Sequence, residues 1–375
     1  YSTDLQHCRN VRRVLGLISL RREFILMKVR VTNFGPIEDA EFELGDVTVV
    51  IGPNASGKSF LSYMLYSVLT ARPLAGPEDL KEIPNEKATL SSYLDVINKV
   101  LSRALKKRLE DVFGVKYREL VTIGRGESRI TFTNEGLGTL SINLGEDFKV
   151  ETELNRDIEL FIKFTEIKEI PAEFTGFIVV NTTKTSTGGY EIDILYGSKS
   201  LGPGGKTNEL LEARKRRVLA TELSRLALNL FFGRLRPATI LPTERNLVIS
   251  NLLGYLSAYI SADRLSRVSD KPVVRYFVRS LMSAMRLLRS EEISIPMFNL
   301  MCKIVEPFVL EVYENGNRIP LPLISSGYAQ VLPVHILSMF GRFLIIEEPE
   351  LNLHAGAQVR VADYLYDLVE RENKR

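Results

Sequence analysis

Apolar residues recur along the chain at two different spacings, and each spacing predicts one kind of element. Near the N-terminus, Val29–Thr32 and Ala40–Leu44 alternate apolar and polar positions on either side of a Gly35-Pro36 turn, which predicts two strands. Every residue of Val47–Ile51 is β-branched, which is typical of a buried parallel strand. A helical spacing follows from about Lys58 to Leu69.

The middle of the chain changes its spacing twice. After a proline-rich break between Arg72 and Pro84, the stretch Ser91–Phe113 is helical. From about Leu120 to Tyr196 the period is two, with Gly and Asn between the runs, which predicts an antiparallel β lobe. Gly197–Thr207 is rich in glycine and predicts a loop, and Asn208–Leu235 predicts a helix.

The last third predicts alternating helices and strands. In chain order, these are a strand at 238–242, a mostly helical segment over 246–288, a hairpin around 314–317, a helix over 329–340, a strand at 343–346 and a final helix to 372.

Composition narrows the class of protein without choosing a function. The 375 residues are 45% hydrophobic and 25% charged, with a net charge of +3, which neither requires nor excludes a nucleic-acid partner. The two cysteines, Cys8 and Cys302, form no CxxC pair, so we expect a reducing, cytoplasmic location. No apolar run approaches the ~18 residues of a membrane span, so we expect no membrane partner.

A phosphate-binding motif follows the third predicted strand. The stretch Gly52, Pro53, Asn54, Ala55, Ser56, Gly57, Lys58, Ser59 has the spacing of a P-loop, Gly-x4-Gly-Lys-Ser, between a strand and a helix. Its glycines let the backbone N–H groups point at phosphates, and the helix N-terminus adds positive charge. Lys58 then reaches the β- and γ-phosphates of ATP, Ser59 ligates Mg²⁺, and we include Phe60 in the ATP site.

Two adjacent glutamates after the strand Phe343–Ile346 predict the second half of this site. Carboxylates at the carboxyl end of a parallel strand face the ligand crevice of an open α/β sheet. We expect Glu347 to hold Mg²⁺ through water, and Glu348 to be catalytic by orienting or deprotonating the attacking water. Lys58 is the second expected catalytic residue, through its contact with the phosphates. A solvated acidic turn is the alternative interpretation of this pair.

Three stretches together resemble one family. "GPNASGKS", "LISSGYAQVLPVHIL" and "LIIEEPELNLHAGAQ" look like the ABC-class P-loop ATPases of the SMC, RecF and OLD type, which do not transport solutes. The resemblance covers roughly 27–70 and 236–375. It implies an α/β fold with a P-loop NTPase, ABC-ATPase-like mixed sheet and flanking helices, interrupted by an inserted α+β lobe.

The resemblance also implies roles for individual residues. Ser325, Ser326 and Gly327 would be a signature that contacts the γ-phosphate of ATP held by a second copy, so the implied partner is an ATP-dependent homodimer. "ILPTERN" is similar to a stretch of some family members, in which Glu244 would sense the nucleotide and Arg245 would touch phosphate or a partner. An ordinary helix start is the alternative for both residues. His354 matches a family position, where we expect a structural histidine.

The expected domains are an N-terminal extension over 1–26, an ATPase core split into 27–74 and 236–375, and an inserted lobe over 75–235. Residues 1–26 are basic and suggest either a targeting or membrane-surface helix or simply upstream sequence. The family has a switch histidine after the last helix, so we expect the chain to be a fragment, and the alternative is a protein that lacks this switch. No glutamine lies between Phe60 and Ala329, so the family's glutamine loop is absent or replaced.

Two functions remain open from the sequence. The first is an Mg-ATP-hydrolysing clamp that acts in DNA repair or in defence against foreign DNA, alone or with a nuclease or defence protein. Arg275, Arg279, Arg286 and Arg289 share one face of a predicted helix and would contact DNA phosphates. The second is a nucleotide-dependent switch that regulates a partner protein, hydrolyses ATP weakly and binds no nucleic acid. A transporter ATPase and a small-molecule kinase fit the motifs less well.

Overall fold

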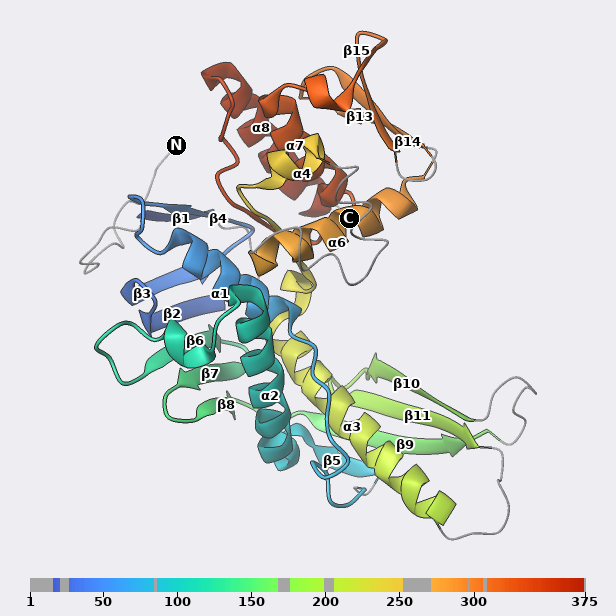
Figure 1. Ribbon diagram of the computed structural model, residues 1–375. Coiled ribbons are helices and arrows are strands. Elements are labelled where there is room, and N and C mark those ends of the chain that lie inside the picture. The colour runs from blue at the N-terminus through green and yellow to red at the C-terminus, as the bar shows by residue number, and fades with distance from the viewer. Residues whose placement is uncertain are drawn as a thin grey trace. The chain divides into compact units, whose positions relative to one another are not determined.

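The protein is a mixed α/β molecule with several sheets and helices (Figure 1). The computed structural model describes residues 16–20, 27–83, 86–167, 176–198, 206–251, 271–289, 291–295, 297–305 and 309–373. The chain divides into two compact units. One contains Tyr1–Ser56, Ala71–Arg108 and Tyr117–Gly233, and the other contains Gly57–Thr70, Leu109–Lys116 and Arg234–Arg375. The domain boundaries expected from the sequence stay predictions.

A five-stranded antiparallel sheet forms the centre of the first unit. Its order is β3 (Ile37–Leu44), β2 (Met27–Phe34), β6 (Ser128–Asn134), β7 (Gly138–Leu144) and β8 (Phe148–Leu154). The strands predicted at 29–32 and 40–44 are confirmed. Alternate residues of β2 are buried, and Val29 lies between Phe42 and Phe132 on neighbouring strands. The period of two therefore turns one apolar row into the core.

Two helices cover this sheet. α2 (Leu94–Phe113) follows a short 3₁₀ turn, η1 (Leu90–Tyr93), and α3 (Lys206–Phe232) runs into another, η3 (Gly233–Leu235). The amide of Val150 in β8 donates to Ser102 of α2 at 2.9 Å. Phe132 of β6 meets Phe232 of α3 edge to face, with ring centroids 5.1 Å apart. Both helices confirm the sequence prediction, and a further 3₁₀ turn, η2, spans Tyr117–Leu120.

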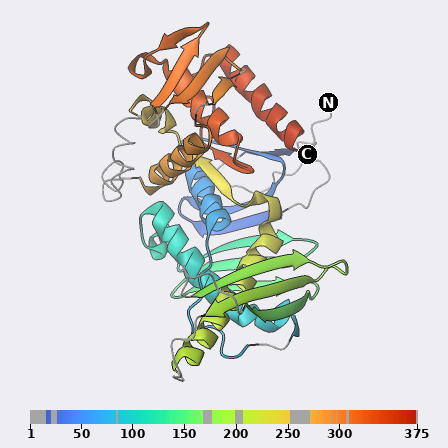
Figure 2. The ribbon, with the colours of Figure 1, turned by 90° about the vertical axis from the view of Figure 1, so that its right-hand side faces the viewer.

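A second sheet in this unit corrects the expectation of a purely antiparallel lobe. Its order is β10 (Gly176–Lys184), β11 (Tyr190–Ser198), β9 (Glu159–Glu166) and β5 (Lys87–Thr89). β10 occupies the edge of the sheet, and β11 lies between β10 and β9. β11 is antiparallel to β10 and parallel to β9. α3 lies along one face of this sheet (Figures 1 and 2), where Thr182 donates to Glu222 at 2.9 Å.

The strand before the P-loop differs most from its prediction. β4 (Val47–Ile51) pairs antiparallel with β1 (Gly16–Leu20) over all five residues, and this pair is a sheet of its own among the described residues. Val49 is 44% and Ile51 50% exposed, so β4 is neither parallel nor buried as expected. Gly16–Leu20 is a strand, so the helix considered for 1–26 is wrong at these residues.

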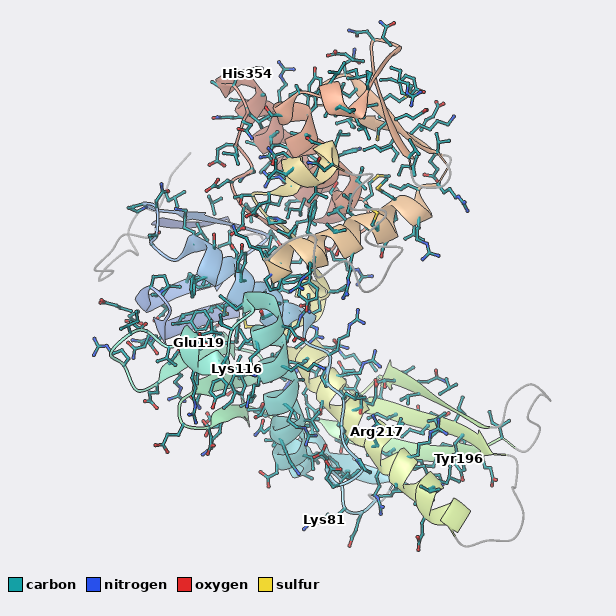
Figure 3. All side chains as sticks on the ribbon, in the orientation of Figure 1. Lys81, Lys116, Glu119, Tyr196, Arg217 and His354 are labelled. Atoms are coloured by element: carbon teal, nitrogen blue, oxygen red, sulfur yellow. The ribbon has the colours of Figure 1, made fainter. Side chains whose placement is uncertain are left out.

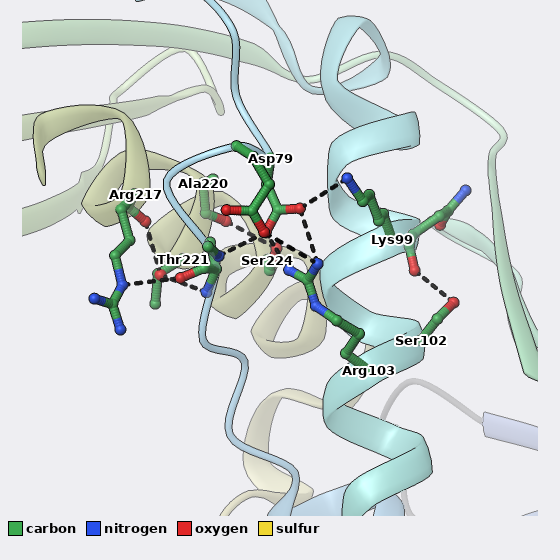
Figure 4. A network of polar contacts seen from close by, with 12 residues as sticks. Asp79, Lys99, Ser102, Arg103, Arg217, Ala220, Thr221 and Ser224 are labelled. Carbon is green, nitrogen blue, oxygen red and sulfur yellow. Dashed lines mark hydrogen bonds and ion pairs between the residues drawn. The ribbon is translucent and has the colours of Figure 1, made fainter. Parts of the chain in front are cut away.

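The proline-rich break is held in place by a buried carboxylate (Figure 4). Residues 71–83 contain no helix or strand, as predicted. The Asp79 side chain is completely buried and accepts hydrogen bonds from Arg103, from Lys99 at 3.1 Å and from the amide of Gly76 at 2.6 Å. Burial alone would raise the pKa of Asp79, but the bonds from Arg103, Gly76 and Lys99 lower it to about 2.

The second unit is built around two short parallel strands. β12 (Ala238–Leu241) pairs in parallel with β17 (Phe343–Ile346), from Ala238 opposite Phe343 to Leu241 opposite Ile346. α1 (Lys58–Thr70) and α6 (Pro272–Leu287) lie against β12, and α4 (Arg245–Ser250) lies against α7 (Ser326–Ser338). The final helix is α8 (Ala355–Asn373). The carboxyl ends of both strands therefore meet at one edge, as the sequence predicted for Glu347.

A four-stranded antiparallel meander completes this unit. Its strands, in order, are β13 (Glu292–Ile295), β14 (Leu300–Val305), β15 (Val309–Glu314) and β16 (Asn317–Ile319). Asn315 and Gly316 have φ values of 50° and 80°, the left-handed backbone that a tight hairpin requires, and this confirms the predicted hairpin. A 3₁₀ turn, η5 (Leu321–Leu323), leads into α7.

The remaining helical predictions hold where residues are described. α4 and α6 account for the ends of the segment predicted over 246–288, while 252–270 lie outside the described residues, as do 199–205 of the predicted loop. Among the helices that the structure describes, none has the length and apolarity needed to cross a membrane.

Candidate nucleotide and magnesium site

The predicted P-loop, Gly52–Ser59, connects β4 to α1 and has a left-handed backbone at two positions. It leaves β4 at Ile51, and α1 begins at Lys58 with the Leu61 amide bonded to the Gly57 carbonyl at 2.9 Å. Gly57 is buried with φ 104°, where any side chain would be strained. Ala55 has φ 60°, an uncommon value for a residue with a Cβ. The boundary between the units falls between Ser56 and Gly57, so Lys58 and Ser59 belong to the unit that holds the acid pair.

Glu347 is fixed at the carboxyl end of the parallel strand pair. Its amide donates to the carbonyl of Leu241 at 3.0 Å, which extends the ladder between β12 and β17 by one residue. Its side chain points into the protein, since the residue is only 7% exposed. A carboxylate buried to this extent needs partners or a cation.

The two oxygens of Glu347 have different surroundings. Oε2 accepts from the Tyr63 hydroxyl at 3.3 Å, and the carboxylate also accepts a hydrogen bond from Ser59, the predicted magnesium ligand of the P-loop. Oε1 is buried and has no hydrogen-bond partner among the described residues. Burial raises the pKa of Glu347, Ser59 and Tyr63 counteract this in part, and the charges of Glu244 and Glu348 raise it further. The carboxylate is therefore suited to a positive charge that no described residue supplies through a hydrogen bond to Oε1.

Tyr63 is a site residue that the sequence reading missed. Its hydroxyl reaches Glu347, and its ring packs edge to face on Phe113, with centroids 5.8 Å apart. Burial and the nearby charges of Glu347 and Glu244 raise the pKa of Tyr63, which keeps the phenol neutral and able to donate. The signal was available, because residues four apart share a helix face and Tyr63 is four residues after Ser59. Phe60 also lies against Phe113, with ring centroids 5.3 Å apart.

Arg245 is buried and binds main-chain carbonyls of the protein itself, whereas the sequence suggested a contact with phosphate or a partner. The residue is 0% exposed. Its Nε donates to the carbonyl of Gln330, and Nη1 donates to the carbonyls of Pro242 and Glu347, at 3.2, 2.9 and 2.5 Å. Nη2 donates to the carbonyl of Glu348 at 2.8 Å. Burial lowers the pKa of Arg245 to about 10, although the charges of Glu347, Glu350 and Glu348 oppose this, so the guanidinium stays charged at neutral pH.

Glu348 binds Arg245 through its main-chain carbonyl, and its side chain is exposed. Its φ of 44° lies in the left-handed region, which is uncommon for a residue with a side chain. The carbonyl of Glu348 also accepts from the amide of Leu351 at 3.1 Å, so the turn after β17 is closed by its own backbone. This turn sends Glu347 inward and leaves the Glu348 carboxylate in solvent, where it can reach a water molecule.

Glu244 has a local partner. Its carboxylate forms an ion pair with Lys271 and accepts from the Thr243 hydroxyl at 3.1 Å. Burial would raise the pKa of Glu244, but the contacts with Lys271 and Thr243 lower it. The side chain makes no capping hydrogen bond to α4, so the capping role considered from the sequence is not observed.

The predicted signature lies at the start of α7. Ser325 precedes the helix, and its hydroxyl oxygen accepts from the amide of Tyr328 at 3.2 Å. Ser325 and Ser326 are exposed, and the Ser325 hydroxyl hydrogen remains available as a donor. Gly327 lies close to the segment after β17, because a Cβ there would be 3.2 Å from Leu353 Cδ2 and 3.4 Å from the carbonyl of Asn352. The signature and the acid-pair turn are therefore neighbours.

His354 has the structural role that we expected. It lies just before α8 (Figure 3), and its Nδ1 accepts from the amide of Ala357 at 3.3 Å. This bond satisfies one of the amides that a helix start leaves without a partner.

The residues fit magnesium on chemical grounds. Mg²⁺ in nucleotide sites takes one or two protein oxygens, with phosphate and water as its other ligands. Ser59 and Glu347 are hydrogen-bonded to each other in the second unit. Two candidate ligands are therefore the Ser59 hydroxyl and Oε1 of Glu347, which has no hydrogen-bond partner among the described residues. No group of three or more His, Cys, Asp or Glu side chains arranged for a metal occurs in the described part of the chain. This donor set suits a metal that arrives with a nucleotide.

Two comparisons with known proteins were negative: no family model matches the chain, and no curated protein matches it.

Proposed function

We propose that the chain binds Mg-ATP at Gly52–Ser59 and hydrolyses it with the aid of Glu347 and Glu348. The observation that carries this proposal is the Glu347 carboxylate, which is buried, hydrogen-bonded to Ser59 of the P-loop, and left with one oxygen that has no hydrogen-bond partner among the described residues. A structural carboxylate would have both oxygens paired. A carboxylate that serves a nucleotide-borne cation needs one oxygen left over.

Each residue has a defined task in this reaction. The amides of Gly52–Ser59 and the Lys58 ammonium bind the phosphates, and Ser59 with Glu347 would hold Mg²⁺, which neutralises phosphate charge when bound. Glu348 accepts a proton from water as the water oxygen attacks the γ-phosphorus. The bond from that phosphorus to the β,γ-bridging oxygen breaks, and ADP leaves with inorganic phosphate.

A second copy of the chain would complete the site. Ser325 caps a 13-residue helix that begins with Ser326 and Gly327, and the exposed hydroxyls of both serines at this helix N-terminus are a donor set for the γ-phosphate. Gly327 lies close to the segment that follows the acid pair. Formation of a dimer through the signature would therefore also affect the position of this segment. The proposed cycle is dimer formation on ATP binding and reopening after hydrolysis.

DNA is the proposed substrate on which this cycle acts, in repair or in defence against foreign DNA. Arg275, Arg279 and Arg286 lie on the face of α6 opposite its buried residues, and none has an ion-pair partner among the residues described. Adjacent members are about 6 and 10 Å apart along the helix axis, so the three cations form a row that would contact phosphates along a DNA strand. Duplex binding should weaken steeply with salt, and Arg279→Ala should lower the slope of log K against log salt by about 1.

The decisive experiment compares wild type with Glu348→Gln for ATP turnover and for molar mass with and without ATP. The proposal expects turnover in wild type, and expects Glu348→Gln to bind ATP, hydrolyse at least about 100-fold more slowly and accumulate as a dimer. Binding without turnover in wild type would favour the alternative, a nucleotide-dependent switch for a partner protein. Absence of Mg-ATP binding would refute the nucleotide site.

A further inference from the structure

We propose that Arg245 is a positioning residue for hydrolysis, a buried strut that holds the Glu347–Glu348 turn against the signature helix α7. The inference rests on the proposed function and goes beyond it, because it replaces the role of phosphate or partner contact expected for Arg245 with a role inside the protein.

The N–H groups of Arg245 point to main-chain carbonyls. A guanidinium has five N–H donors, and here its three nitrogens donate to carbonyls of Gln330, Pro242, Glu347 and Glu348. These carbonyls belong to three elements: α7, the end of β12 and the turn after β17. A completely buried arginine with this set of contacts has little capacity left for a phosphate, but it fixes three elements to one another.

Acidic side chains lie close to Arg245. Three glutamates, Glu347, Glu348 and Glu350, are near enough for their charges to act on it. Among the described residues, none of their carboxylates forms an ion pair with the guanidinium. Arg245 instead binds the main chain of Glu347 and Glu348. Its charge thus steadies the acidic turn, while Glu347 keeps an unpaired oxygen for a cation and Glu348 keeps its carboxylate for water.

The backbone of Glu348, to which Arg245 donates, is strained. Glu348 has φ 44°, a conformation that persists in a residue with a Cβ only when its surroundings hold it. The bond from Arg245 Nη2 to the Glu348 carbonyl supplies such a restraint from outside the turn. Without this bond, the turn is free to relax and to rotate the Glu348 carboxylate away from the attacking water.

The link to α7 adds a consequence for regulation. Nε of Arg245 donates to the carbonyl of Gln330, which lies one turn beyond the signature residues of the same helix. A displacement of α7, such as engagement of the signature by a second copy, would therefore be transmitted through one side chain to the main chain of Glu348. The strut couples dimer formation to the position of the proposed catalytic carboxylate.

The test uses Arg245→Lys, which keeps the charge but places it on a single ammonium that cannot span three elements. Arg103→Lys is the matched control, because Arg103 binds the buried Asp79 in the other unit. We expect Arg245→Lys to keep its dissociation constant for ATP within about threefold and to lose about 10- to 100-fold in kcat, the range for residues that orient a reactive group. Amide hydrogen exchange over 347–353 should become faster. Arg103→Lys should lower thermal stability without changing either quantity.

Three outcomes would overturn the inference: unchanged kcat in Arg245→Lys, an equal loss of kcat in Arg103→Lys, or unchanged exchange over 347–353. If Arg245→Lys fails to fold, the wild type decides the matter, because the Leu351 amide bonded to the Glu348 carbonyl should then exchange slowly, and exchange at the rate of an unstructured peptide refutes the strut. Failure of the proposed function is distinct, because it appears in the wild type as absence of Mg-ATP binding and turnover.

Discussion

Arg245 donates from Nη2 to the carbonyl oxygen of Glu348 at 2.8 Å, and Glu348 holds a left-handed backbone with φ 44°. The residue that we propose as the proton acceptor is thus positioned by a buried side chain from another element. The same guanidinium donates to the carbonyl of Glu347, so one residue controls the main chain of both acids. The proposed hydrolysis would therefore depend on the placement of this turn as much as on its carboxylates.

Replacing Glu347 by glutamine should stabilise the nucleotide-free protein and weaken its binding of magnesium. Because burial raises the pKa of Glu347, its contribution to stability is present below the ordinary value of 4.5 and is lost as pH rises through the higher folded value. At neutral pH the buried charge is therefore unfavourable. Removing it should raise the melting temperature.

The measurement for Glu347→Gln is a thermal melt with EDTA, followed by titration of Mg²⁺ in the presence of ATP. The magnesium affinity of the wild type should also fall as pH is lowered, because protons compete for the same oxygen. Asp363→Asn, on the exposed face of α8, removes one negative charge elsewhere and should change neither quantity. A lower melting temperature in Glu347→Gln would contradict the charge argument.

Ala55 should tolerate glycine but not valine. Its φ of 60° is free of strain for glycine, costs alanine about 1 kcal/mol, and is strongly disfavoured for a β-branched residue. Ala55→Val should therefore weaken ATP binding at least about tenfold, which corresponds to 1.4 kcal/mol, while Ala55→Gly should bind as well as wild type or better. Equilibrium titration with ATP checks both variants. Ala362→Val on the exposed surface of α8 controls for the general cost of valine, and equal affinities of Ala55→Val and Ala55→Gly would be evidence against this loop geometry.

Asp79 should make the first unit sensitive to acid. Because its pKa is lowered to about 2, its stabilising effect is present above the ordinary value of 3.8 and is lost as pH falls toward 2. Asp79→Asn should cost about 2 kcal/mol at pH 6 and little at pH 2, measured by denaturant unfolding. The comparison is Asp39→Asn, which breaks an exposed ion pair with Arg30 and should cost less than about 1 kcal/mol. Equal losses in the two variants would show that burial of Asp79 is irrelevant.

The sequence predicted the positions of helices and strands better than it predicted which strands pair with each other. The period of two located β2, β3 and β6–β8, and the P-loop pattern located α1, because spacing and turn residues are local signals. It failed on β4, whose β-branched residues suggested a buried parallel strand, because pairing with Gly16–Leu20 depends on a segment remote in sequence. The parallel pairing of β9 with β11 was missed for the same reason.

The site shows the same division between local and tertiary information. Ser59 and Glu347 were predicted from motifs, and their hydrogen bond lies within one unit. Tyr63 was missed although its spacing from Ser59 places it on the same helix face. Arg245 was singled out because its stretch resembles one in some family members, but its burial follows from the packing of β12, β17 and α7, which the sequence does not reveal. A charged residue in a motif can therefore hold the main chain in place as readily as it can bind a ligand.

The Gly327 contact predicts a variant that separates folding from dimer formation. A Cβ at Gly327 would be 3.2 Å from Leu353 Cδ2, a contact that a small movement of the leucine relieves, so Gly327→Ala should keep a melting temperature close to that of wild type. Gly327→Val needs more space and should displace the segment after the acid pair. In a Glu348→Gln background, we expect ATP to produce the dimer with Gly327, to produce less of it with alanine and none with valine, as measured by light scattering. Dimer formation by the valine variant at the level of the glycine parent would show that this contact does not govern assembly.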